Sequence, residues 1–164
     1  MIVVSDTSPL NYLVLIGQVG VLPKLFEEIH TAPEVMDELL DARTPEVVRQ
    51  WAQAPPGWLR VSRCTTRMEV PGKLGAGEAN AIALAKELGI NWLLMDERDV
   101  ARFARGHGLC VIETLAVLEQ AASRRLLNLP DALRRLQTTT FRVSLPLLRA
   151  LLERDAARRP DDLE

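Results

Sequence analysis

The feature that most constrains the fold is an alternation of short apolar runs with helical stretches along the 164 residues. The runs expected to be strands lie at residues 2–5, 28–31, 59–62, 92–95 and 109–112. The stretch 78–88 is apolar almost all round, which is typical of a deeply buried helix. Short buried strands that alternate with helices predict an α/β domain with a parallel sheet.

A chain of this length is expected to form one domain with a substantial core. We expect that domain to span residues 1–154 and to be followed by a flexible tail at 155–164. Residues 63–77 are expected to be a loop because glycine and proline cluster at their end. Helices are expected at 10–16, 19–26, 33–41, 44–53, 78–88, 97–107, 114–124, 130–137 and 145–154.

Composition excludes several classes of protein. The net charge of -2 provides no overall attraction to nucleic acid or to a membrane surface, so such binding would need a local patch. Cys64 and Cys110 lie far apart and are expected to be reduced thiols of a cytoplasmic protein. Asp6 interrupts the first apolar run, so we expect no signal peptide, and no apolar run is long enough to cross a bilayer.

An acid follows two of the expected strands. Asp6 comes directly after the run IVVS, and Asp96 comes after WLLM. Ligands of parallel sheets bind beyond the carboxyl ends of the strands, at the point where the strand order reverses. If these two strands are neighbours there, both carboxylates face one crevice.

Two further acids are expected near the same crevice. Glu78 opens the most apolar helix, directly after the flexible sequence LGAG, and Glu38 borders the apolar stripe of its own helix. Two like charges about 6 Å apart repel by roughly 3 kcal/mol at an effective dielectric near 20. A fold keeps such a cluster mainly when a cation offsets the repulsion or when some of the acids stay protonated. The cation would be Mg²⁺ or Mn²⁺, because the ligands are hard oxygens without His or Cys.

Five segments carry a resemblance to the PIN-domain superfamily, of the kind found as VapC-type toxins. They are VVSDTSP at 3–9, APEVMDEL at 32–39, LGAGEANAIALA at 74–85, LLMDERDVAR at 93–102 and LCVIETLAVL at 109–118. The resemblance implies a three-layer α/β/α fold with a five-stranded parallel sheet in the order 3-2-1-4-5. It also implies a metal-dependent ribonuclease.

The resemblance assigns the acidic quartet of that superfamily to Asp6, Glu38, Glu78 and Asp96, with Mg²⁺ or Mn²⁺ as the cofactor. The supporting hydroxyl is expected to be Ser8, with Thr7 as the alternative. Further candidates are Asp99 as a fifth acid, Thr114 in the pocket wall, and Arg98, Arg102 and Arg105 as contacts to the RNA backbone. Many PIN domains have Asp where this chain has Glu78, and the longer side chain could shift the metal position or weaken metal binding.

Ordinary structural roles remain open for the same residues. Asp6, Asp96 and Ser8 are also suited to capping the helices that follow them, and Glu78 to a first helical turn. Glu38 belongs to an acidic stripe of the kind that usually faces solvent. Asp99 and the three arginines suit an exposed helix face.

Two rival folds fit the sequence poorly. The sequence GAGEAN at 75–80 starts like a dinucleotide fingerprint, but no convincing strand precedes it. A receiver domain would require an Asp after the third strand, LRVS, where there is none.

The interpretation adopted is a metal-dependent endoribonuclease, expected to be the cytoplasmic toxin of a toxin–antitoxin pair. RNA is the expected substrate, and the expected partners are a second copy of the chain and a small antitoxin protein. The apolar helix at 10–16 and the C-terminal helices are the surfaces expected to bind these partners. The alternative is a PIN-fold module that binds RNA or protein without catalysis.

Overall fold

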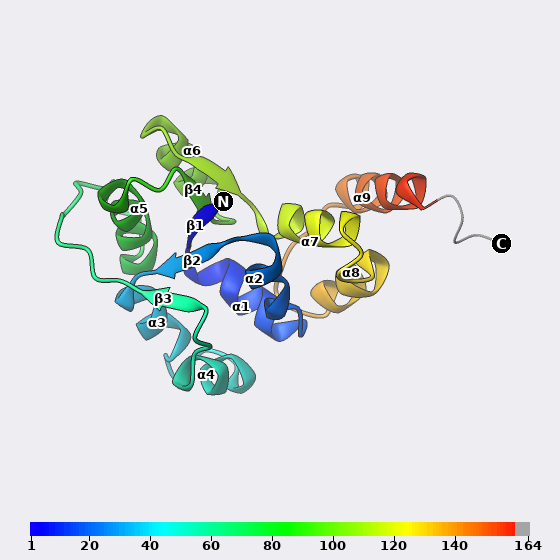
Figure 1. The fold of residues 1–164 in the computed structure, drawn as a ribbon, viewed down its shortest axis with the longest axis horizontal. Coiled ribbons are helices and arrows are strands. Elements are labelled where there is room, and N and C mark those ends of the chain that lie inside the picture. Colours follow the sequence, from blue (N-terminus) through cyan, green and yellow to red (C-terminus); the bar gives the residue numbers. More distant parts are fainter. Residues whose placement is uncertain (160–164) are drawn as a thin grey trace.

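The five apolar runs form one parallel sheet in the computed structural model, which describes residues 1–159 (Figure 1). The strands are β1 (Ile2–Ser5), β2 (Glu28–Thr31), β3 (Leu59–Val61), β4 (Trp92–Leu94) and β5 (Cys110–Ile112). Their order is β3-β2-β1-β4-β5, and helices cover both faces of the sheet. The expected three-layer α/β/α fold with strand order 3-2-1-4-5 is therefore confirmed.

The central strand β1 pairs in parallel with β2 on one side and with β4 on the other. Val3 and Val4 are fully buried, as are Leu93 and Leu94 on β4. The backbone N–H of Asp6 donates to the carbonyl of Leu94 across 3.0 Å, which continues the pairing one residue beyond β1. The reversal of strand order thus lies between β1 and β4, and Asp6 lies beside the end of β4.

Helices follow the strands as expected, with changes at their ends. Their bounds are α1 (Thr7–Leu15), α2 (Leu22–Leu25), α3 (Pro33–Leu39), α4 (Glu46–Gln53), α5 (Ala76–Leu88), α6 (Arg98–Gly106), α7 (Thr114–Ser123), α8 (Leu129–Gln137) and α9 (Leu145–Arg158). The helix expected over 19–26 is instead a 3₁₀ turn, η1 (Val19–Val21), followed by α2. Pro23 explains the division, because proline lacks the N–H that a continuous helix would use and is tolerated in a first turn.

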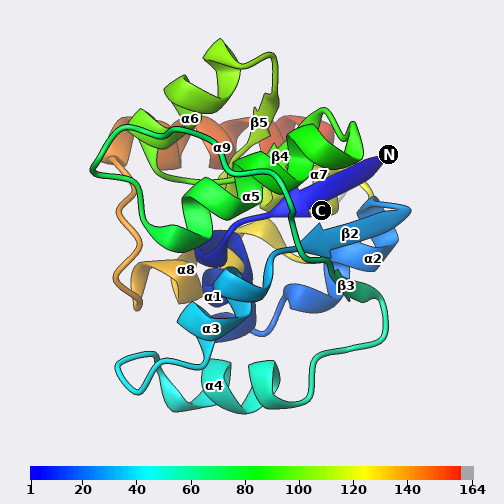
Figure 2. The same ribbon diagram turned by 90° about the vertical axis from the view of Figure 1, so that its left-hand side faces the viewer.

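The packing of α5 brings two of the candidate acids together. Alanines line this helix, and Ala81 and Ala85 are fully buried, so it packs closely on β1 and β4 (Figure 2). The helix α3 packs in turn against α5. The start of α5, which carries Glu78, therefore lies near α3, which carries Glu38.

Two expectations about the ends of the molecule are corrected. The helix α9 continues through Arg158, with Asp155 only 5% exposed, so the tail does not begin at residue 155. The Nε of Arg159 lies 3.8 Å from Oδ1 of Asp155. Residues 160–164 of the expected tail lie outside the described residues.

The helix expected to bind a partner through its apolar side is α1. Its Leu10 and Leu13 are fully buried in the core, so that apolar face is not available to a partner. Leu145 and Leu147 on α9 remain exposed. Both cysteines are free. Within residues 1–159, no helix has both the length and the hydropathy required to cross a bilayer.

Candidate active site

Asp6 is the most deeply buried of the four predicted acids, with only 3% of its surface exposed. It occupies the N-cap position of α1, yet its side chain makes no capping hydrogen bond. Its Oδ1 atom is buried and has no hydrogen-bond partner among the described residues. A carboxylate oxygen without a partner in a dry site is costly, so the capping role does not explain why Asp6 is there.

The electrostatics of Asp6 follow from its burial. The pKa of Asp6 is raised from 3.8 to about 7, and burial is the largest cause. The negative charges of Glu78, Glu38 and Asp96 contribute to this rise, and a hydrogen bond from the backbone of the next residue opposes it. Desolvation disfavours the charged form of a carboxyl, and nearby carboxylates add repulsion. Strongly perturbed carboxyls in a cleft are typical of functional sites, although structural networks also produce them.

Glu38 is half-buried, and both of its carboxylate oxygens have hydrogen-bond partners. The Thr7 hydroxyl donates to its Oε2, and the backbone N–H of Gly77 donates to its Oε1 across 2.8 Å. Glu34 and Asp41 are also half-buried and only Asp37 is exposed, so the acidic stripe of α3 does not face solvent as a whole.

The absence of a side chain at Gly77 makes room for Glu38. A Cβ placed there would lie 2.5 Å from Oε2 of Glu38, which is closer than atoms can approach without movement. The glycine therefore permits the contact between the start of α5 and the carboxylate.

Asp96 follows β4 and is held by residues from two other elements. Its Oδ1 accepts from the backbone N–H of Thr114 at 2.7 Å, and its Oδ2 accepts from the hydroxyls of Thr114 at 2.7 Å and Ser8 at 2.9 Å. Asp96 thus binds the first residue of α7 and does not cap α6, whose N-cap position is Glu97. Ser8 and Thr114, two of the predicted supporting hydroxyls, thus both donate to Asp96, and their role in a functional site stays a prediction.

Glu78 has a structural role and also faces the site. Its Oε2 accepts from the backbone N–H of Gly75 at 2.9 Å, which satisfies a free donor at the start of α5. The same side chain lines the cavities around Asp6.

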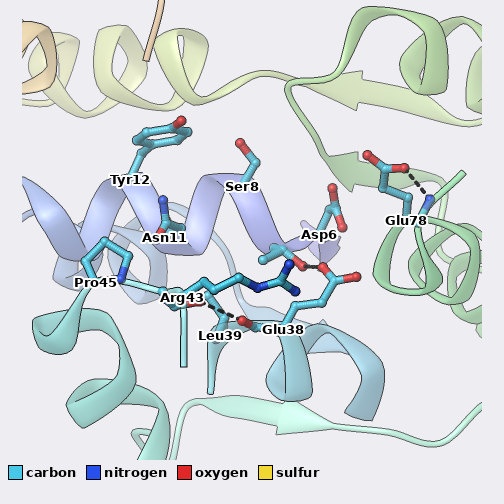
Figure 3. A pocket seen from close by; sticks show the side chains of 12 residues that line it. Asp6, Ser8, Asn11, Tyr12, Glu38, Leu39, Arg43, Pro45 and Glu78 are labelled. Atoms are coloured by element: carbon cyan, nitrogen blue, oxygen red, sulfur yellow. Dashed lines mark hydrogen bonds between the residues drawn. The ribbon is translucent and has the colours of Figure 1, made fainter. Parts of the chain in front are cut away.

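Two cavities meet at Asp6 and Glu78. The first cavity, of about 550 Å³, is lined also by Glu38, by Thr7 and Ser8, by Asn11 and Tyr12 of α1, and by Arg43. The second cavity, of about 370 Å³, is lined also by Asp96, Ser8, Tyr12, Glu97, Thr140, Phe141 and Arg142. Figure 3 shows Asp6 between Glu38 and Glu78, with Arg43 extending toward Glu38. The fold therefore brings all four predicted acids to the walls of two adjoining cavities.

Other predicted residues lie farther out. The side chain of Asp99 is 84% exposed and pairs with Arg102, whose Nη1 lies 3.5 Å from its Oδ1. Arg98, Arg102 and Arg105 are exposed on α6, and none of them lines the first or the second cavity.

Two arginines that the sequence analysis missed do line these cavities. Arg43 lies on the turn after α3, where Asp41 Oδ1 accepts from its Nε at 2.9 Å and Oδ2 accepts from its Nη2 at 3.2 Å. Arg142 lies in the segment between α8 and α9. No motif marks either residue. Asn11 and Tyr12, in contrast, follow Ser8 by three and four residues, a helical spacing that indicates the same face.

The donor set suits a hard divalent cation. Carboxylate oxygens come from four elements, hydroxyls hold two of those carboxylates, and the buried Oδ1 of Asp6 has no partner among the described residues. Mg²⁺ and Mn²⁺ prefer such oxygen ligands. Within residues 1–159, no three Asp, Glu, His or Cys side chains already converge on one point. Glu38 and Glu78 instead bind backbone N–H groups of the first turn of α5 and its cap.

The fold and the acidic cluster define a PIN domain, and comparison with known proteins establishes the family. A family model described as a PIN domain matches residues 2–156, so this chain belongs to that family. PIN domains are commonly metal-dependent nucleases. No curated protein matches the chain.

A solved structure with a similar fold is that of a PilT N-terminus domain protein from the hyperthermophilic archaeon Sulfolobus solfataricus. Its TM-score is 0.53 and its sequence identity is 16%, over 74% of this chain and 93% of that one. At this identity the likeness supports the fold alone.

Proposed function

We propose that this protein is a metal-dependent endoribonuclease that hydrolyses RNA phosphodiester bonds. The observation that carries the proposal is Asp6, a buried carboxylate with an oxygen that lacks a partner among the described residues. The three other acids line the same pair of cavities. Structural roles account for the contacts of Glu38, Glu78 and Asp96, but no structural role accounts for Asp6.

In this mechanism, the acids and the hydroxyls of the site would have different roles. Asp6, Glu38, Glu78 and Asp96 would hold the cation, and Thr7, Ser8 and Thr114 would keep the carboxylates oriented. When bound, Mg²⁺ or Mn²⁺ supplies the Lewis acidity and the charge neutralisation that phosphodiester hydrolysis requires. No protein side chain is needed as a nucleophile.

Cationic side chains would position the substrate. Arg43 and Arg142 line the cavities next to the acids and would bind phosphates of the RNA backbone. Arg98, Arg102 and Arg105 on α6 would bind more distant phosphates. Binding through these residues would weaken as salt rises, because each neutralised phosphate releases counterions.

We further propose that the chain acts as a cytoplasmic toxin with a small antitoxin partner and forms a homodimer. The support is the resemblance to VapC-type toxins, together with Leu145 and Leu147, which α9 leaves exposed. The second candidate function is a PIN-fold module without catalysis. The observation that favours it is that the acids within residues 1–159 do not already converge.

Metal binding separates the two functions. Calorimetric titration with Mn²⁺ should show binding to the wild type and none to a variant that carries Asp6→Asn and Asp96→Asn. Asp37→Asn is the matched control, because Asp37 is exposed on the same helix as Glu38. Single-stranded RNA should be cleaved by the wild type and by the control. Absence of Mn²⁺ binding in the wild type would favour the non-catalytic module, and normal cleavage by a folded Asp6→Asn variant would refute the proposed mechanism.

A further inference from the structure

A third cavity adjoins the acids at Glu78. It has a volume of about 450 Å³ and lies between the loop that precedes α5 and the helix α6. It is lined by Pro71, Lys73, Leu74, Glu78, Glu97, Asp99, Val100 and Phe103. Glu78 is shared with the first and second cavities, and Glu97 is shared with the second. An RNA strand whose phosphate lies at the acids would therefore have this cavity beside it.

The lining of the third cavity suits a flat, uncharged ring. Leu74, Val100 and Phe103 provide apolar surface, and Phe103 provides an aromatic face. The lining contains three acidic residues and one lysine, so the cavity would repel a phosphate group. Proteins that bind single-stranded RNA commonly stack bases on aromatic side chains.

Phe103 is the aromatic residue in the lining of the third cavity, whereas Tyr12 and Phe141 line the second. Tyr12 and Phe141 pack edge to face with their ring centroids 4.9 Å apart, and the Tyr12 hydroxyl bonds Thr140 at 2.8 Å. Their rings are therefore engaged with each other. Phe103 contacts the exposed ring of His107 one turn later, with centroids 4.5 Å apart, and still lines the cavity.

Glu97 provides an acceptor between this cavity and the acids. It occupies the N-cap position of α6, but its side chain makes no capping hydrogen bond. It is exposed, and no ion pair of its carboxylate is found within residues 1–159. A carboxylate accepts hydrogen bonds only, so it favours a base that presents an amino group, such as N4 of cytosine. Uracil presents an oxygen at the same place.

We propose that the third cavity binds the nucleobase next to the scissile phosphate, with Phe103 stacking on the base and Glu97 selecting an exocyclic amino group. This inference rests on the proposed ribonuclease function. The cavity would thus make cleavage selective for cytosine or adenine over uracil at one flanking position.

The test uses short single-stranded RNAs with a mapped cleavage site. Each flanking position carries cytosine, uracil or an abasic nucleotide in turn, and both cleavage in Mn²⁺ and binding in EDTA are measured. We expect the wild type to prefer cytosine to uracil at one position. Phe103→Leu should weaken binding of the cytosine RNA by about tenfold, the scale of one stacked base. The same variant should leave the abasic RNA unaffected.

Two further variants sharpen the result. Glu97→Gln should remove the preference for cytosine over uracil and retain the stacking effect. Trp58→Leu is the matched control, because Trp58 is a half-buried aromatic residue that lines none of these three cavities, and it should leave base preference unchanged.

The possible outcomes separate this inference from the proposed function. The inference would be overturned if the wild type cleaved and bound RNAs with all bases equally well. It would also be overturned if Phe103→Leu weakened binding of the abasic RNA as much as binding of the cytosine RNA. Base-selective binding without cleavage would support the cavity assignment and overturn the ribonuclease proposal. Absence of both binding and cleavage would overturn both.

Discussion

Replacing Asp6 with asparagine should stabilise the metal-free protein at neutral and alkaline pH. The pKa of Asp6 is raised from 3.8 to about 7, mainly by burial and in smaller part by the neighbouring carboxylates. One pKa unit corresponds to about 1.4 kcal/mol, so the full difference corresponds to roughly 4 kcal/mol. Asp6 is almost fully buried, so solvent does not screen the effect appreciably.

The sign follows from the raised pKa. The folded protein holds the Asp6 proton more tightly than the unfolded chain, so this contribution to stability is complete below pH 3.8. It is lost as the pH rises through about 7, because the carboxylate must then ionise inside the protein. Asparagine has nearly the same shape and does not ionise, so it avoids this loss.

The measurement is urea denaturation in EDTA at pH 5 and pH 8. The unfolding free energy of Asp6→Asn minus that of the wild type should increase by about 3 kcal/mol between these pH values. Asp37→Asn, at an exposed position on α3, should show little change. Equal differences at both pH values would show that Asp6 is not held in a desolvated site. At pH 8, Mn²⁺ should raise the melting temperature of the wild type and leave that of Asp6→Asn unchanged.

Three other predictions concern the contacts around the acids. Gly77→Ala should lower the cleavage rate at least tenfold, because the added Cβ would displace Glu38. Gly72→Ala is the control and should have no effect, because there is open space around Gly72. Equal cleavage rates for the two variants would refute the role of the Gly77 contact. Arg43→Gln should weaken RNA binding and reduce the slope of log affinity against log salt by about 0.7, the value for one phosphate of a single strand. Arg63→Gln, at an exposed position, is the control. An unchanged salt slope in Arg43→Gln would show that Arg43 does not bind the RNA. Thr114→Val should destabilise the fold by about 1 kcal/mol and slow cleavage, because Asp96 loses a hydroxyl donor. Thr114→Ser keeps the hydroxyl and should restore both stability and cleavage rate. If serine restores neither, the hydroxyl of Thr114 is not the cause of the effect.

The local pattern of the sequence was sufficient to predict the strands, the parallel sheet and the two acids at strand ends. Hydrophobic periodicity reports burial directly, and a carboxylate directly after a buried strand stands out in any α/β sequence. The strand order 3-2-1-4-5 came from the family resemblance. Helix ends were less accurate, as at α1 and α2, because proline and local capping shift them by a few residues.

Only the tertiary structure decided which partners the acids have. Contacts between distant segments determine that Thr7 and Gly77 hold Glu38, and that Ser8 and Thr114 hold Asp96. Arg43 and Arg142 line the cavities because a turn and a late segment fold back onto the sheet edge. Such long-range contacts leave no periodic trace in the sequence, whereas burial along a strand or a helix does, because each element must present its apolar side to the core.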